Sequence, residues 1–182
     1  MSLALLVFAA VCVVNPFRVR AAVPSDDPVR IAAGGATLAW VGVAVVAVIS
    51  DVLLDTEAFP ASTVRMALGV VAVLQGGWTL VGRLPTPEPR MPGRRAALVP
   101  VAFPVILTPG LGLLAASAAL DRSVPVALGV LAGALASVPA LAWAARDERE
   151  TSARLRGGAA RLLAGGLVLA GVALLINGVY DL

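Results

Sequence analysis

Two proline-containing interruptions, Asn15-Pro16 and Thr108-Pro109-Gly110, break otherwise apolar stretches of the sequence. Proline lacks an N–H group and collides with the carbonyl four residues earlier, so each interruption should break a helix and free backbone carbonyls. Those carbonyls and the side chains of Asn15 and Thr108 can accept hydrogen bonds from an ammonium group or coordinate a cation. The N–H groups of a helix that restarts at Pro109 can bind a carboxylate, because a helix N-terminus is electropositive. This combination suits a small zwitterion.

Three further positions extend the predicted site. Gly112, like Gly110, would let a ligand approach the backbone closely. Gln75 is polar in the middle of an apolar segment, and Arg18 either selects an anion or extends to the lipid headgroups. Packing is the alternative explanation for each break alone, and the matched pair favours a binding site. The candidate substrate-binding residues are Asn15, Pro16, Arg18, Gln75, Thr108, Pro109, Gly110 and Gly112.

Other kinds of chemistry lack the residues that they need. The sequence contains no histidine and one cysteine, Cys12, so it offers no disulfide, no thiolate cluster and no imidazole ligand. The interiors of the apolar stretches hold no carboxylate for a buried proton relay. No phosphate-binding loop, zinc-protease motif or catalytic triad is present. We therefore expect no enzymatic activity, no catalytic residue, no metal and no cofactor.

The composition indicates a membrane protein. Of the 182 residues, 59% are apolar and 14% are charged, whereas soluble domains contain about 25% charged residues. The basic residues are all arginines and lie between the apolar stretches, so membrane topology explains them better than nucleic-acid binding does. The composition excludes a cytosolic enzyme, a disordered tail and a nucleic-acid-binding domain. It makes the lipid bilayer the expected partner.

Six apolar stretches are long enough to cross a bilayer, which takes about 20 residues per helix. They predict an all-α membrane protein of six transmembrane helices, of which the first and the fourth are broken. A signal peptide is the alternative for the first stretch, but no basic residue precedes Arg18, so we expect a retained span. The predicted spans are 2–23, 30–50, 60–82, 96–120, 123–145 and 158–180.

The arginines predict the orientation of the chain. Twelve of the 14 belong to the first, third and fifth loops with their helix ends, and Arg65 and Arg122 belong to the opposite side. Because basic residues mark the cytoplasmic side, both termini should be extracytoplasmic. The composition, rich in alanine and arginine and free of lysine, is typical of GC-rich bacterial genomes. The expected location is therefore the bacterial inner membrane.

The proline-rich segment 83–95 divides a single membrane domain into two halves, residues 1–82 and 96–182. Four prolines keep this cytoplasmic linker extended. Each half contains three spans, so the second half would enter the membrane upside down, which is the inverted-repeat plan of many secondary transporters.

An alignment of the two halves supports this plan. At an offset of 96 residues four identical residues coincide, and at an offset of 93 the two interruptions meet. Chance matches in a sequence rich in alanine and glycine are the alternative explanation. The aligned pairs are Arg65 with Arg161, Gly69 with Gly165, Gly82 with Gly178 and Asp51 with Asp147.

The motifs of three spans resemble those of the MarC family of integral membrane proteins. Asn15-Pro16 is similar to the family's Asn-Pro-x-Gly pattern, and residues 102–104 with 108–110 are similar to its Phe-Pro-Leu…Gly-Pro-Gly pattern. Residues 64–69 resemble the run that opens the family's third span. The resemblance covers essentially the whole chain. It implies a six-span inverted-repeat fold and, for some members, transport of small neutral amino acids such as alanine and glycine.

This sequence departs from the family pattern at two positions of the predicted site. Arg18 stands where the family usually has glycine, and Thr108 replaces the glycine before Pro109. Both departures put strict amino-acid selectivity in doubt.

We therefore expect a secondary transporter or exporter of small neutral amino acids or similar solutes, which works by alternating access. A carrier or flippase for an anionic or lipid-linked substrate is one alternative. A non-transporting subunit of a membrane complex is the other. The expected partners are a small-molecule substrate and the bilayer, without nucleic acid, and the sequence also allows a homo-oligomer.

Overall fold

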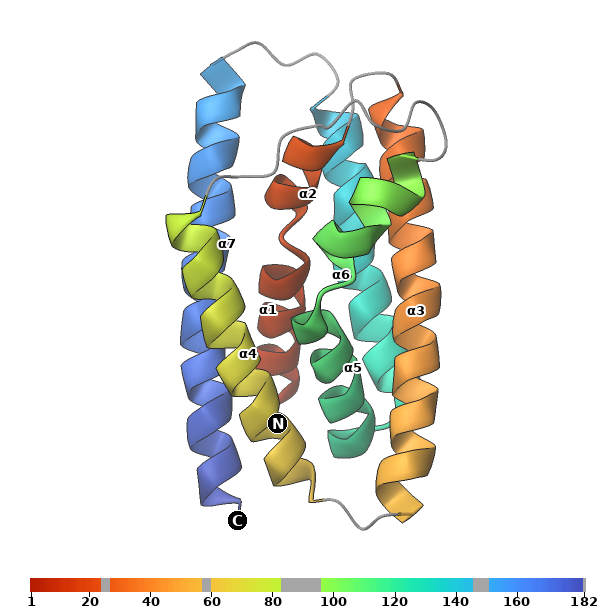
Figure 1. Cartoon of the computed structure of the whole chain (residues 1–182), viewed down its shortest axis with the longest axis vertical. Helices are drawn as coiled ribbons and strands as arrows, with labels where there is room; N and C mark the ends of the chain where they lie inside the picture. The colour runs from red at the N-terminus through yellow and green to blue at the C-terminus, as the bar shows by residue number, and fades with distance from the viewer. Residues whose placement is uncertain (24–26, 57–59, 83–95, 146–150, 182) are drawn as a thin grey trace.

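The computed structural model describes residues 1–182 except 24–26, 57–59, 83–95, 146–150 and 182. The described residues form helices and no strands, arranged as an elongated bundle (Figure 1). The proline-rich linker lies outside the described residues. The helices are α1 (Leu3–Val14), α2 (Pro16–Ala22), α3 (Pro28–Thr56), α4 (Ala61–Val81), η2 (Leu98–Ile106), α5 (Pro109–Asp121), α6 (Val124–Ala144) and α7 (Thr151–Tyr180).

The helices have the lengths and compositions of a multi-pass membrane protein. Five stretches are long and apolar enough to span a bilayer, and α5 is a shorter apolar helix of 13 residues. The predicted span 96–120 corresponds to η2, which is non-helical at Val99 and Phe103, followed by the short α5. The spanning stretches are Leu3–Ala22, Pro28–Val52, Ala61–Val81, Val124–Ala144 and Arg154–Tyr180.

Two helices extend beyond their predicted ends. Helix α3 continues to Thr56 rather than ending at residue 50, and α7 begins at Thr151 rather than at residue 158. At 1.5 Å per residue, α3 is about 44 Å long, which exceeds a hydrocarbon core of about 30 Å. Asp51 and Arg156 lie just outside the predicted bounds, and a helix can continue past such residues through the headgroup region.

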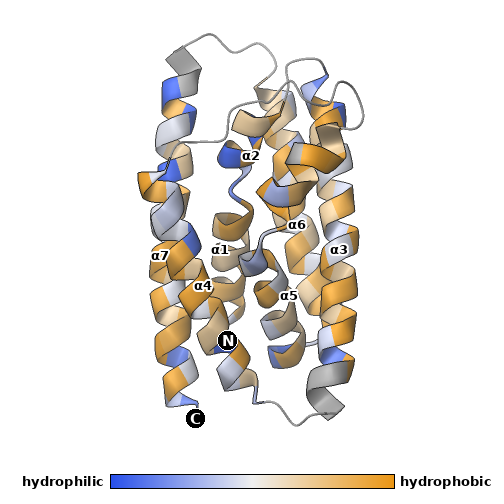
Figure 2. Cartoon of the chain, viewed as in Figure 1, coloured by the Kyte–Doolittle hydropathy of each residue, from blue (hydrophilic) through white to orange (hydrophobic). Residues whose placement is uncertain are grey.

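Hydrophobic residues predominate along the helices of the bundle (Figure 2). Large apolar side chains that a soluble protein would bury are exposed on every long helix, and on α7 they repeat at helical spacing. A hydrocarbon environment is the solvent in which such faces are stable. Examples on α7 are Leu155, Leu162, Leu169 and Ile176.

Helices α4 and α7 pack closely because glycines line their contact. A Cβ atom added at Gly69 would lie 2.7 Å from the carbonyl oxygen of Gly171, and one at Gly76 would lie 2.7 Å from that of Ala164. Both distances are shorter than Cβ contacts in proteins. Small residues at such contacts let transmembrane backbones approach one another.

Gly76→Ala should therefore lower stability by about 1–3 kcal/mol, the range for overpacking a tight contact. The added methyl group would push α4 away from the α7 backbone at Ala164. Gly77→Ala is the matched control, because nothing lies within 4 Å of its Cβ position. Unfolding of each variant in mixed micelles with increasing SDS measures the difference. Equal midpoints for the two variants would contradict the assigned contact.

The four aligned residue pairs do not share environments throughout. Arg65 is buried, whereas Arg161 is exposed. Gly69 packs against α7, whereas nothing lies within 4 Å of the Cβ position of Gly165. Identical residues at aligned positions therefore have different structural roles in the two halves.

Candidate functional site

The first predicted break is present at Asn15, which ends α1 and begins α2. Asn15 has a left-handed backbone (φ 42°, ψ 75°), a conformation that asparagine adopts more readily than most residues. Its Oδ1 accepts a hydrogen bond from the N–H of Arg18 at 3.2 Å. Its Nδ2 donates to the carbonyl of Ala160 in α7 at 2.8 Å. The buried Asn15 side chain thus links the break to α7 by a hydrogen bond. The second hydrogen of its amide group can donate to another acceptor.

The second predicted break is present at Thr108, between η2 and α5. Thr108 has an extended backbone, and its Oγ1 accepts a hydrogen bond from the N–H of Leu111 at 3.3 Å. The carbonyl of Thr108 accepts from Leu111 and Gly112. No acceptor for the N–H of Gly110 occurs among the described residues. At the N-terminus of α5, the N–H groups of Leu111 and Gly112 therefore bond to Thr108, whereas the N–H of Gly110 can still donate to a ligand.

The two breaks share one type of cap on different backbones, left-handed at Asn15 and extended at Thr108. In each, a polar residue caps a helix with its side-chain oxygen and is followed by proline at the first helical position. Proline suits that position because its missing N–H would lack a partner there anyway. From the middle of the bundle, α2 and α5 run in opposite directions (Figure 1). The breaks stand out as less hydrophobic than the flanking helices (Figure 2).

The packing places the two breaks next to one another. Helix α1 packs against α5, and α2 packs against η2. The broken helices therefore lie alongside each other on both sides of their interruptions, inside the ring of longer helices (Figure 1).

Gln75 of α4 lies against the N-terminus of α5. A Cβ atom at Gly110 would lie 2.5 Å from Oε1 of Gln75 and 3.8 Å from Oγ1 of Thr108. Glycine at position 110 is therefore what lets the Gln75 amide reach the second break. The structure brings together three of the predicted site residues, Gln75, Thr108 and Gly110.

The other predicted site residues line the two breaks to different degrees. Pro16 is buried and Arg18 is half-buried at the start of α2, whereas Pro109 is exposed. Gly112 is half-buried, and nothing lies within 4 Å of its Cβ position, which leaves room beside α5. Asn15 and Arg18 belong to the first break, and the Asn15 side chain contacts α7 rather than Gln75.

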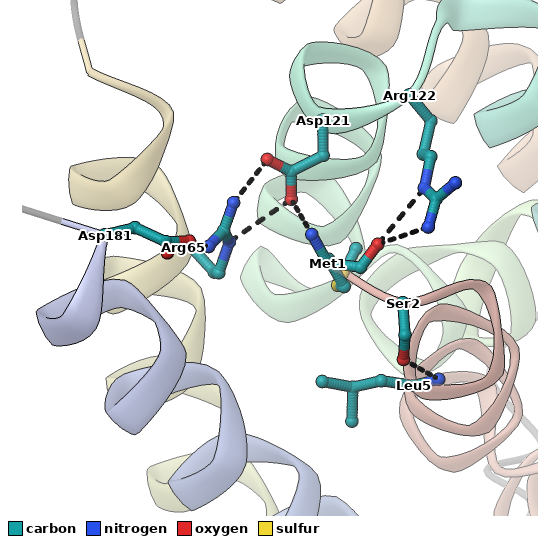
Figure 3. A network of polar contacts seen from close by, with 7 residues as sticks. All are labelled: Met1, Ser2, Leu5, Arg65, Asp121, Arg122 and Asp181. Atoms are coloured by element: carbon teal, nitrogen blue, oxygen red, sulfur yellow. Dashed lines mark hydrogen bonds and ion pairs between the residues drawn. The ribbon is translucent and has the colours of Figure 1, made fainter.

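An ion cluster that the sequence analysis did not identify closes one end of the bundle (Figure 3). Arg65 of α4 forms two hydrogen bonds with Asp121 of α5, at 2.6 and 3.2 Å, and a further ion pair with Asp181. The Met1 nitrogen lies 3.5 Å from Asp121, and Arg122 donates to the Met1 carbonyl. The side chains of Arg65 and Asp121 are 7% and 5% exposed, so this ion pair is buried.

The sequence contains only a weak signal for this cluster. Arg65 and Arg122 are the two arginines on the side opposite the other twelve. Asp121 directly follows an apolar run, where charged residues usually face water. The ion pair between Arg65 and Asp121 depends on the packing of α4 against α5, and no local sequence pattern indicates it.

The described residues include no group of three or more His, Cys, Asp or Glu side chains that could hold a metal ion. One apolar cavity of about 360 Å³ lies on α7, beside Leu175, Ile176, Val179 and Tyr180. It begins 15 residues beyond Ala160, the α7 residue that contacts the first break, and is separate from the candidate site.

The chain matches no family model, no curated protein and no solved structure in comparisons with known proteins.

Proposed function

We propose that the protein is a secondary transporter of small neutral amino acids or similar small solutes. It would work by alternating access to a site formed by its two broken helices. The observation that carries this proposal is the pair of half-helices α2 and α5, each of which begins with a polar side-chain cap followed by proline, and which run in opposite directions from the middle of the bundle. Discontinuous helices of this kind form the substrate sites of many secondary transporters.

The groups at the second break fit a zwitterion. The Gln75 amide can donate to a carboxylate or accept from an ammonium group, and the N–H of Gly110 points from an electropositive helix end. The room beside Gly112 lets a small solute reach the backbone.

An inverted repeat belongs to the same proposal. The most extensive helix contacts join α4 with α7 and α3 with α6, which are the corresponding spans of the two halves. Related helices that pair in this way are consistent with a pseudo-two-fold axis between the halves. Membership of the MarC family is part of the proposal and is supported by the sequence motifs.

We also propose that both termini are extracytoplasmic in a bacterial inner membrane. Arginines at the end of α2 and near the starts of α3 and α7 gather at one end of the bundle, while Arg65 and Arg122 lie at the other. The basic end would face the cytoplasm.

Uptake of labelled alanine and glycine into proteoliposomes tests the function, and Gln75→Ala tests the site. We expect Gln75→Ala to slow uptake about ten-fold or more, because a lost polar contact in a buried site is worth about 1.5 kcal/mol or more. Thr79→Val is the matched control one turn along α4, since the Thr79 hydroxyl donates to its own helix at the Gln75 carbonyl. Wild-type rates no higher than those of empty vesicles would refute amino-acid transport.

The half-buried Arg18 beside the first break favours a second candidate, a carrier for an anionic or lipid-linked substrate. Arg18→Gly separates the two functions. An anion carrier should lose its activity, whereas an amino-acid transporter should keep its alanine uptake.

A further inference from the structure

Ser117 of α5 is a buried hydroxyl without a partner. It is 0% exposed, and its Oγ forms no hydrogen bond among the described residues. The hydroxyls of Thr37 and Thr79 instead donate to the carbonyl one turn earlier in their own helices, at 2.9 and 2.8 Å. A buried polar group without a partner costs free energy. This cost is explained if Ser117 has a partner in another state of the protein.

Ser117 lies on the face of α5 that is turned toward α4. Gly110, two helical turns before it, faces Gln75 of α4, and Asp121, one turn after it, pairs with Arg65 of α4. Ser117 therefore lies between these two contacts. We call this contact zone, from Gly110 to Asp121 along α5, the α4–α5 seam. It leads from the candidate site to the end of the bundle that holds both termini (Figure 1).

The α4–α5 seam is closed in this structure. Leu68 of α4, two turns from Gln75, and Leu114 of α5, one turn from Gly110, are both completely buried. Beyond them, the Arg65–Asp121 ion pair closes the end of the seam (Figure 3).

The helices on the two sides of the seam are fastened to different neighbours. Helix α4 is held to α7 by the glycine contacts described above, and Asp181 beyond the end of α7 joins the pair through Arg65. On the other side, Met1 before α1 contacts both Asp121 and Arg122 at the end of α5. The Arg65–Asp121 pair thus joins two groups of helices, α4 with α7 and α1 with α5.

We propose that the α4–α5 seam is the route by which solute leaves the candidate site, that Ser117 contacts the solute on this route, and that the Arg65–Asp121 pair is its gate. This inference rests on the proposed transport function. The substrate chemistry agrees with it, because a carboxylate can replace Asp121 as the partner of Arg65, and an ammonium group can replace Arg65 as the partner of Asp121. A zwitterion therefore compensates both charges of the open gate, which a solute with no charged group or with one charged group cannot do.

The test places a cysteine in the seam. Ser117→Cys is made in a Cys12→Ala background, since Cys12 is the single cysteine of the sequence. The protein is held in lipid nanodiscs, where both membrane faces are accessible, and is exposed to a small water-soluble methanethiosulfonate reagent. Modification of S117C should be slow with the gate intact. It should become about ten-fold faster or more when Arg65→Met and Asp121→Asn together remove both charges, because the open state gains population.

Ala115→Cys is the matched control, because Ala115 is also 0% exposed but lies on the opposite face of α5. It should remain unmodified in both backgrounds. Equal rates at S117C with and without the ion pair would overturn the gate, and so would fast modification of S117C with the pair intact. An equal increase at A115C would also overturn it, because the pair would then hold the whole fold together. The reagent reports access without any solute, so this result is independent of the transport assay.

Discussion

Gly110→Ala is expected to reduce alanine uptake about ten-fold or more, to the level of Gln75→Ala, while the protein remains folded. The reason is steric. A methyl group at this position would lie 2.5 Å from Oε1 of Gln75, which is the end of a flexible side chain. The Gln75 amide can rotate away at little cost to folding, but it then leaves the second break.

The double variant Gly110→Ala/Gln75→Ala distinguishes this mechanism from a general loss of activity. If Gly110→Ala acts by displacing Gln75, the double variant should transport as slowly as either single variant and no slower. Gly129→Ala in α6 is the control, because nothing lies within 4 Å of its Cβ position. Additive losses in the double variant would show that the methyl group acts elsewhere, for example on the α5 backbone.

The positions of the two breaks could be predicted from sequence because their cause is local. A proline after a residue that can cap a helix stops one helix and starts the next, whatever packs around it. Asn15-Pro16 and Thr108-Pro109 each contain this cap and proline in two adjacent residues. In the structure, Asn15 and Thr108 are the helix caps. The helical spans follow in the same way from uninterrupted apolar composition.

The contacts between spans could not be predicted, because they depend on which helix faces match. Gln75 was a candidate because it is polar in mid-span, but nothing in the sequence pairs it with Gly110, 35 residues later. Arg65 and Asp121 are 56 residues apart and carry no shared motif. Identity between the halves was also a poor guide to environment, since Arg65 is buried in an ion pair and its aligned partner Arg161 is exposed.

Arg65→Met is expected to be the most destabilising of the single substitutions considered, at about 3 kcal/mol, the lower end of the range for breaking a buried ion pair. It leaves Asp121, which is 5% exposed, with a charge that, among the described residues, the Met1 nitrogen at 3.5 Å still compensates. The lower end applies because the cluster lies at the end of the bundle, where Asp181 is 57% exposed and water can approach.

Asp121→Asn should cost less than Arg65→Met, because Arg65 keeps Asp181 as a partner. The double variant Arg65→Met/Asp121→Asn should recover much of the lost stability, since the asparagine carries no charge and its side-chain oxygen can still accept a hydrogen bond from the Met1 ammonium. Unfolding midpoints in SDS-containing mixed micelles measure all three variants in one cycle. A double variant as unstable as the sum of the two single variants would contradict the coupling. If the recovery is observed, the ion pair contributes little to the net stability of the fold, so faster modification of S117C without the pair reports opening of the seam and not loss of the fold.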